Sequence, residues 1–353
     1  MTPRQEPADS KTATDSQNPE DAGRQLRHGI AGLVIVGVLV VAMVLAVPGL
    51  NGVGHALRNA DLTWIVVGIL FEVLSNIGYA LVVILVYPQA PRRLAARLAW
   101  AESAFGAAVS IGGAGSLGLG AWVLHTLGVP NRRVAESSAT LFLATSAVNA
   151  IVLALTGFGV AAGVFSGPSN LLLTLVPGVV ALIAVLFFLL LPRIVERHER
   201  TLDAHPRWGA TLRTSADGVR GAKRTLFSTQ WLAIGAWAYL LCDIAVLWLC
   251  LHALGQSPPF AAVILAYQIG YIANIVPVPG GIGVLDAGLV GMLVLCGIRA
   301  TPATGAVLAY HAVSLWVPAS IGTLAFVLLR RTIASGRVTP PPAPVSSGRG
   351  DSP

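Results

Sequence analysis

Long apolar stretches without a single charged residue constrain this chain more than any other feature. They are Gly29–Val47, Ser137–Phe165, Asn170–Leu191 and Ala303–Leu329. Each is close to or above the roughly 20 residues that an α-helix needs to cross a bilayer. Lipid offers backbone N–H and C=O groups no hydrogen-bonding partner, so such segments must be helical. We therefore predict an all-α, polytopic membrane protein.

Two further stretches are predicted to be spans, although each carries one acidic residue. Leu62–Val86 contains Glu72, and Gln230–Leu254 contains Asp243. Composition agrees, because 55% of the residues are hydrophobic and 11% are charged, against roughly 25% charged residues in an ordinary soluble domain. The sequence thus predicts six full transmembrane helices.

The net charge of +7 is concentrated between the spans. Basic residues occupy the gap at 92–97, the gap at 131–133, the long gap at 192–228 and the end of the last span at 330–331. By the positive-inside rule these gaps lie in the cytoplasm. We expect a plasma (inner) membrane protein with both termini cytoplasmic. Nucleic acid is not an expected partner, because its binding needs basic residues interleaved with aromatic ones on a folded domain.

The ends of the chain differ in composition from its centre. Residues 1–23 are polar and 332–353 are rich in Pro, Ser and Gly, which predicts disordered cytoplasmic tails. Residues 24–331 are expected to form one integral membrane domain, with 192–228 as a basic cytoplasmic loop.

Counting the crossings leaves two stretches, Leu98–Val129 and Pro259–Ile298, that must enter and leave the membrane on one side. Glycine in a helix interior costs roughly 1 kcal/mol and breaks the helix. The first stretch is centred on Gly112, Gly113 and Gly115, and the second on Pro277, Pro279, Gly280, Gly281 and Gly283. We predict two re-entrant helical hairpins. Their similar motifs suggest an inverted repeat, as in many transporters; glycines that only allow close helix packing are the alternative.

Four acidic residues are expected at membrane depth: Glu72, Glu102, Asp243 and Asp286. An ionised carboxylate near a helix centre costs about 2.5 to 3.5 kcal/mol, so each should face a cavity, a partner or a proton. Our hypothesis is that some of them line a hydrophilic path for a cationic headgroup or for coupling protons. For Asp286 the alternative is a carboxylate that complements a helix dipole, and for Glu102 a position near the interface.

A polar stripe leads into the second glycine motif. Its members, spaced three and four residues apart on one helix face, are Tyr267, Gln268, Tyr271 and Asn274. Substrate contact and interhelical hydrogen bonding remain equal alternatives for this stripe. The turn at Gly280–Gly283 opens a helix, and its exposed N–H groups predict a cradle for a lipid phosphate.

Motifs for catalysis are not found. No nucleophile elbow, zinc-binding His-Glu-x-x-His or nucleotide-binding glycine pattern occurs, and the three cysteines have no metal-type spacing. We expect no metal and no cofactor. A membrane-embedded lipid-modifying transferase that uses intramembrane acids as bases is one alternative, and a structural partner subunit of an envelope-assembly complex is another.

The string from Pro277 to Asp286, Pro-x-Pro-Gly-Gly-x-Gly-x-x-acid, resembles the flippase-like membrane domain family, the transmembrane region of lysylphosphatidylglycerol synthases. The resemblance covers roughly Gly29 to Arg331. It implies a multi-pass protein that translocates charged phospholipids or polyprenyl-phosphate-type lipids in cell-envelope assembly. Membrane lipids are then the expected partners, and a separate envelope-lipid enzyme is a candidate partner, since no stretch resembles the soluble aminoacyltransferase domain.

The sequence departs from the family pattern at two places. The first glycine segment lacks the usual proline and arginine, having Ser110-Ile111-Gly112-Gly113-Ala114-Gly115 instead. The acid after the second motif is Asp286 rather than glutamate. The first departure leaves the substrate open.

Overall fold

The computed structural model describes residues 51–108, 114–197, 230–271 and 284–334, with positions 209, 212, 216, 219 and 220. These residues form helices and no strand. The helices are α2 (Asn51–Arg58), α3 (Leu62–Val86), α4 (Arg92–Ala108), α5 (Ala114–Thr126), α6 (Asn131–Ala161), α7 (Leu171–Arg197), α10 (Gln230–Ala253), α11 (Phe260–Gly270), α12 (Val284–Leu295) and α13 (Ala300–Ala334). The all-α prediction is confirmed for the described residues.

Four of these helices, α3, α6, α10 and α13, are long and apolar enough to cross a membrane, and α7 makes a fifth if its two arms count as one span. The arms of α7 meet at an angle of 46° between Phe187 and Leu189. Pro192 explains the bend, because a proline ring clashes with the carbonyl four residues earlier. The protein is therefore polytopic. The predicted span Gly29–Val47 lies outside the described residues, so the total of six stays a prediction.

Two helices begin or end beyond their predicted apolar limits. α6 begins at Asn131, where Pro130 occupies the N-cap with φ −58°, so the polar turn before Ser137 is helical. α13 continues to Ala334, which places residues 332–334 in a helix and not in the tail. In both cases the helix extends past the apolar stretch, because length in lipid limits only the hydrophobic part of a helix.

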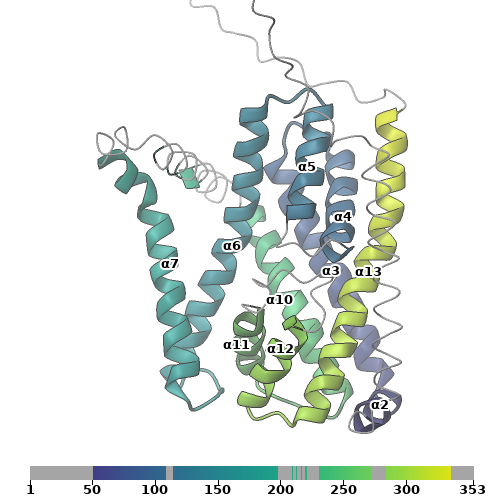
Figure 1. The fold of residues 1–353 in the computed structure, drawn as a ribbon, viewed down its shortest axis with the longest axis vertical. Helices are drawn as coiled ribbons and strands as arrows, with labels where there is room; N and C mark the ends of the chain where they lie inside the picture. The colour runs from purple at the N-terminus through teal and green to yellow at the C-terminus, as the bar shows by residue number, and fades with distance from the viewer. Residues whose placement is uncertain are drawn as a thin grey trace, which may run out of the picture.

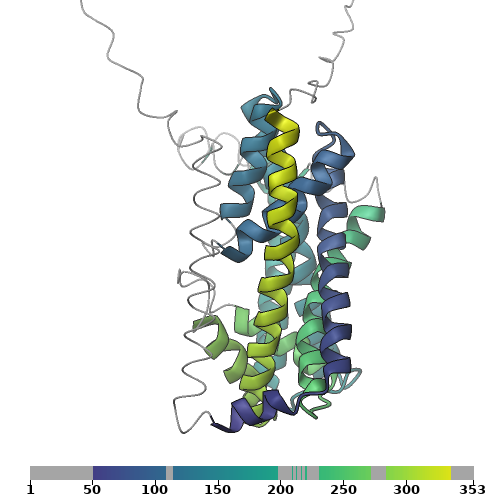
Figure 2. The same ribbon diagram turned by 90° about the vertical axis from the view of Figure 1, so that its right-hand side faces the viewer.

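The helices surround an antiparallel central pair, α3 and α10, which make the most extensive contact in the molecule. The N–H of Asp61, at the start of α3, donates to the carbonyl of Ala253, at the end of α10, over 2.9 Å. α13 runs the length of the bundle beside α4 and α3 (Figures 1 and 2). α7 stands apart and is attached mainly through α6 (Figure 1).

Short helices flank both glycine-rich centres. α4 and α5 pack against each other in the upper half of Figure 1, and α11 and α12 do so in the lower half. Residues 109–113 and 272–283 between them lie outside the described residues. The positions of the short helices agree with two hairpins from opposite ends. That each pair is re-entrant in a bilayer stays a prediction.

The second helix of each pair ends in the same cap. After α5, Gly128 has φ +73°, its N–H donates to His125, and the N–H of Val129 donates to Leu124. After α12, Gly297 has φ +93°, and the equivalent bonds run to Val294 and from Ile298 to Leu293. This is the Schellman motif, in which glycine supplies the left-handed backbone conformation.

The order and spacing of helices also repeat. Four helices begin at residues 62, 92, 114 and 131, and four counterparts begin in the same order at residues 230, 260, 284 and 300. Contacts follow the same rule: α13 packs on α4, and its counterpart α6 packs on α11. α3 and its counterpart α10 run antiparallel. The set α3 to α6 and the set α10 to α13 are therefore oppositely directed within the bundle.

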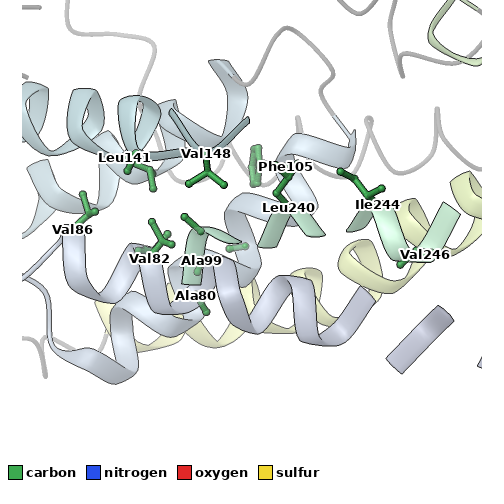
Figure 3. Close-up of a cluster of buried hydrophobic side chains, with 14 of the residues drawn as sticks. Ala80, Val82, Val86, Ala99, Phe105, Leu141, Val148, Leu240, Ile244 and Val246 are labelled. Carbon is green, nitrogen blue, oxygen red and sulfur yellow. The ribbon is translucent and has the colours of Figure 1, made fainter. Parts of the chain in front are cut away.

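The main apolar core lies where α3, α4, α6 and α10 meet. Figure 3 shows Val82 of α3, Ala99 of α4, Leu141 of α6 and Leu240 of α10 pointing into it. The α3–α10 pair approaches closely through two glycines. A Cβ built on Gly78 would lie 2.8 Å from the carbonyl oxygen of Gly235 and 2.8 Å from the backbone nitrogen of Tyr239.

We predict that Gly78→Ala destabilises the protein. Alanine favours a helix over glycine by about 1 kcal/mol, but here the added methyl group meets backbone atoms, and overpacking costs about 1 to 3 kcal/mol. Thermal unfolding of the detergent-purified protein, followed by size-exclusion chromatography, measures the effect. Gly291→Ala is the matched control, since nothing lies within 4 Å of its Cβ position. Equal unfolding temperatures for the two variants would show that the crossing tolerates separation.

Candidate functional site

The carboxyl group of Asp243 on α10 is held by tyrosines from two other helices. Tyr267 of α11 donates a hydrogen bond to Oδ2. The hydroxyl of Tyr310 on α13 lies 3.2 Å from both carboxyl oxygens. Tyr267 is 5% exposed and Tyr310 1%. These bonds supply donors to a carboxyl group in the interior of an apolar bundle, where an unpaired polar group is costly.

Tyr271, the residue that ends α11, completes this group. Its ring stacks on that of Tyr267, with centroids 4.5 Å apart, because residues four apart lie on one helix face. Its hydroxyl is 3.4 Å from that of Tyr310. We call Asp243, Tyr267, Tyr271 and Tyr310 the Asp243 cluster.

A second acid, Glu72 of α3, lies close enough to Asp243 to interact with it electrostatically. Glu72 is buried, and the Asn76 amide donates to its Oε1 over 2.8 Å. Its Oε2 has no hydrogen-bond partner among the described residues. Two ionised carboxylates at short range repel each other. A proton or an incoming cation would relieve this repulsion.

A histidine lies beside the Asp243 cluster. The ring of His311 lies beside that of Tyr310, with centroids 5.3 Å apart, and it interacts electrostatically with Asp243. No lysine or arginine of the described residues forms an ion pair with Asp243 or Glu72. The same residues contain no group of three or more His, Cys, Asp or Glu that could hold a metal ion.

The chemistry of the Asp243 cluster suits an organic cation. Carboxylates provide the countercharge, and aromatic faces attract ammonium groups by about 0.5 to 2 kcal/mol. The phenol hydroxyls fix the carboxylate of Asp243 in one orientation, so its geometry is set before a ligand arrives.

Three of the predicted site residues come together in the Asp243 cluster, namely Asp243, Tyr267 and Tyr271, with Glu72 beside them. Gln268 points elsewhere, and its side chain donates to the backbone carbonyl of Asn149 on α6 over 3.1 Å. The predicted stripe on α11 therefore combines a site face with an interhelical hydrogen bond.

Glu102 is separate from the Asp243 cluster. It lies on α4, is fully buried, and accepts a 2.9 Å hydrogen bond from Tyr79 of α3. The packing of α3, α4 and α5 encloses it. Whether Glu102 lies near the membrane interface stays a prediction.

The structure describes only two of the remaining predicted site residues. Gly115 is the second residue of α5, and Asp286 lies in the first turn of α12. The others lie outside the described residues: Gly112, Gly113, Asn274, Pro277, Pro279, Gly280, Gly281 and Gly283. The phosphate cradle stays a prediction.

The structure adds residues that the sequence did not single out. Tyr310 contributes two bonds to Asp243. Asn76 and Tyr79 bond Glu72 and Glu102. Their signal was present: Glu72, Asn76 and Tyr79 follow one another at spacings of four and three, which defines a polar face in an apolar helix.

Comparison with known proteins agrees with this fold. The family model for the lysylphosphatidylglycerol synthase TM region matches residues 30–322. The chain belongs to this family. The match spans both short-helix pairs and every residue of the Asp243 cluster. A UPF0104 membrane protein of Methanothermobacter thermautotrophicus is 30% identical over 105 residues, which are 30% of this chain and 29% of the archaeal protein. That relative is thus similar over less than a third of its own length.

We predict energetic coupling between Tyr267 and Asp243 of this family member. A double-mutant cycle of Tyr267→Phe and Asp243→Asn, read from unfolding in a denaturing detergent, should give about 0.5 to 2 kcal/mol, the range for interhelical hydrogen bonds in membranes. Tyr267→Phe combined with Glu136→Gln is the control cycle, expected near zero, since Glu136 is exposed on α6 and no hydrogen bond joins those residues. A coupling as small as that of the control would remove the Tyr267–Asp243 bond from the site.

Proposed function

We propose that this protein translocates a membrane lipid with a cationic or amine-bearing headgroup across the plasma membrane. Its family supports a function related to membrane lipids. The observation that carries the proposal is the Asp243 cluster, which gathers one carboxylate and three tyrosines beside a second acid in the bundle interior.

The charge balance favours a cation as ligand. Two acids at membrane depth cost several kcal/mol unless neutralised, and no lysine or arginine among the described residues pairs with either. A lipid amine would neutralise them only during its passage. The cost in the empty state would then be offset by binding, which suits a site that must be occupied and vacated in turn.

The helix arrangement supports a path for the headgroup. The pairs α4/α5 and α11/α12 approach from opposite halves of the bundle (Figure 1). Broken helices of this kind in inverted repeats form midplane substrate sites in many transporters. In this proposal the turn at Gly280–Gly283 holds the lipid phosphate, the Asp243 cluster holds the amine, and the acyl chains remain in lipid.

We predict that the wild-type protein accelerates leaflet exchange of acyl-labelled phosphatidylethanolamine in proteoliposomes, and that Asp243→Asn slows this exchange at least about tenfold, equivalent to about 1.4 kcal/mol. The reason is that asparagine keeps the shape and loses the countercharge. Chemical bleaching of the outer-leaflet label gives the rate. Glu136→Gln, at an exposed position of α6, is the matched control and should exchange at the wild-type rate.

Acyl-labelled phosphatidylglycerol tests the headgroup separately. Equal exchange of both lipids would remove the preference for an amine and leave translocation standing. A covalently changed lipid, detected by mass spectrometry, would establish the transferase alternative. No acceleration and no modified lipid would favour a structural subunit.

The proposed orientation gives its own prediction. In a cysteine-free background, Arg133→Cys at the start of α6 should react with an impermeant maleimide only from the cytoplasmic side. Ala162→Cys, at the other end of that helix, should react only from outside, because α6 crosses the membrane once. Labelling of intact cells and of inverted vesicles distinguishes the two. Reaction of Arg133→Cys in intact cells would invert the proposed topology.

A further inference from the structure

Glu102 is the most completely enclosed acid among the described residues. Its side chain is 0% exposed. One carboxyl oxygen, Oε2, accepts the 2.9 Å bond from the hydroxyl of Tyr79. The other, Oε1, has no hydrogen-bond partner among the described residues. A carboxyl oxygen left in this way carries a desolvation cost that simple packing does not explain.

A second unpaired polar group borders the same place. A Cβ built on Gly120 of α5 would meet both Oε1 of Glu102 and, at 2.9 Å, the hydroxyl oxygen of Tyr87. Tyr87 is also 0% exposed, and its hydroxyl has no hydrogen-bond partner among the described residues. The absence of a side chain at Gly120 gives these two groups their space.

The surroundings of Glu102 contain no cation to neutralise it. From α3 the titratable groups facing it are Tyr79 and Tyr87. The basic residue of α5, His125, is exposed. Arg97, on α4 itself, donates to Thr332 of α13 over 2.8 Å, and α13 has its arginines at 330 and 331, near its end. No ion pair to Glu102 forms among the described residues.

A proton is the cation that fits. An isolated buried carboxylate costs several kcal/mol even after relaxation, and a metal cation such as Ca²⁺ needs six to eight oxygen ligands. A tyrosine hydroxyl can both donate and accept. The hydroxyl of Tyr87 borders the same space without bonding Glu102, and a small movement of either side chain would let it accept from the protonated acid or donate to the ionised one.

Tyrosines connect this site to the Asp243 cluster. The ring of Tyr79 packs on that of Tyr239 of α10, with centroids 5.2 Å apart. Tyr239 lies one turn before Asp243 on the same helix and interacts electrostatically with Asp243 and Glu72. A change of charge or packing at Glu102 can therefore reach the Asp243 cluster through Tyr79 and Tyr239.

We propose that Glu102 is a proton-binding site, distinct from the headgroup site, and that its protonation and deprotonation couple lipid translocation to the proton gradient. The coupling rests on the proposed function, whereas proton binding at Glu102 does not. Two measurements separate these claims.

Infrared difference spectroscopy between acid and alkaline buffers tests proton binding in the purified full-length protein. The expected result is a C=O stretching band of a protonated carboxyl group that titrates in the wild type and is lost in Glu102→Gln. Tyr79→Phe should shift its frequency, because it removes the hydrogen-bond donor to that carboxyl. Tyr87→Phe should shift it less, because it removes a polar group that only borders the carboxyl. Glu136→Gln should keep the band. A spectrum unchanged by Glu102→Gln overturns the site.

The steady-state leaflet distribution of acyl-labelled phosphatidylethanolamine tests coupling, in vesicles of phosphatidylethanolamine and phosphatidylglycerol. With one proton per lipid, a gradient of one pH unit should shift the distribution about tenfold relative to protein-free vesicles with the same gradient. Glu102→Gln should still exchange lipid but reach an even distribution. Coupling is overturned if the wild-type leaflet distribution does not change with the pH gradient. It is also overturned if the Glu102→Gln distribution equals that of the wild type. Absence of any wild-type exchange defeats the proposed function, and the infrared result then decides the proton site alone.

Discussion

The close crossing of α3 and α10 is the interaction on which the rest of this structure depends. In lipid, helices gain little from hydrophobic burial against one another, so they associate through van der Waals contact and hydrogen bonds that small residues allow. Gly78 and Gly235 bring the two backbones together. The hydroxyl of Ser75 then bonds the carbonyl of Tyr239 over 2.7 Å. This crossing places the acids of both helices in the interior.

Two acids of the bundle interior, Asp243 and Glu102, accept hydrogen bonds from tyrosines. Asp243 is bonded by Tyr267 and Tyr310, and Glu102 by Tyr79. A phenol donates a hydrogen bond without adding charge, so it orients a carboxyl group and leaves its charge available to a ligand or a proton. An arginine in the same place would neutralise the acid permanently. The choice of tyrosine is consistent with sites that exchange a cation.

The sequence predicted the fold class and most helices, because the length of an uncharged apolar stretch can be read directly from consecutive residues. The four described spans match predicted segments, as does α7 if its two arms count as one span, and short helices flank both glycine-rich centres. The Asp243 cluster was predicted in part, since Tyr267 and Tyr271 share a visible stripe. Tyr310 could not be assigned to it, because its link to Asp243 spans 67 residues and depends on how α13 packs. The enclosure of Glu102 could not be predicted for the same reason, because it comes from the packing of α3 and α5 on α4.

The ribosome synthesises the two helices of the central crossing, α3 and α10, at different times. α3 begins at residue 62 and α10 at residue 230, which at 5 to 20 residues per second is an interval of roughly 10 to 30 s on the ribosome. Throughout that interval Gly78 and Ser75 have no helix to pack against, and Glu72 has entered the bilayer before the helix that carries Asp243 exists. Until the second half of the chain is synthesised, the polar face of α3 therefore lacks its partner helix α10.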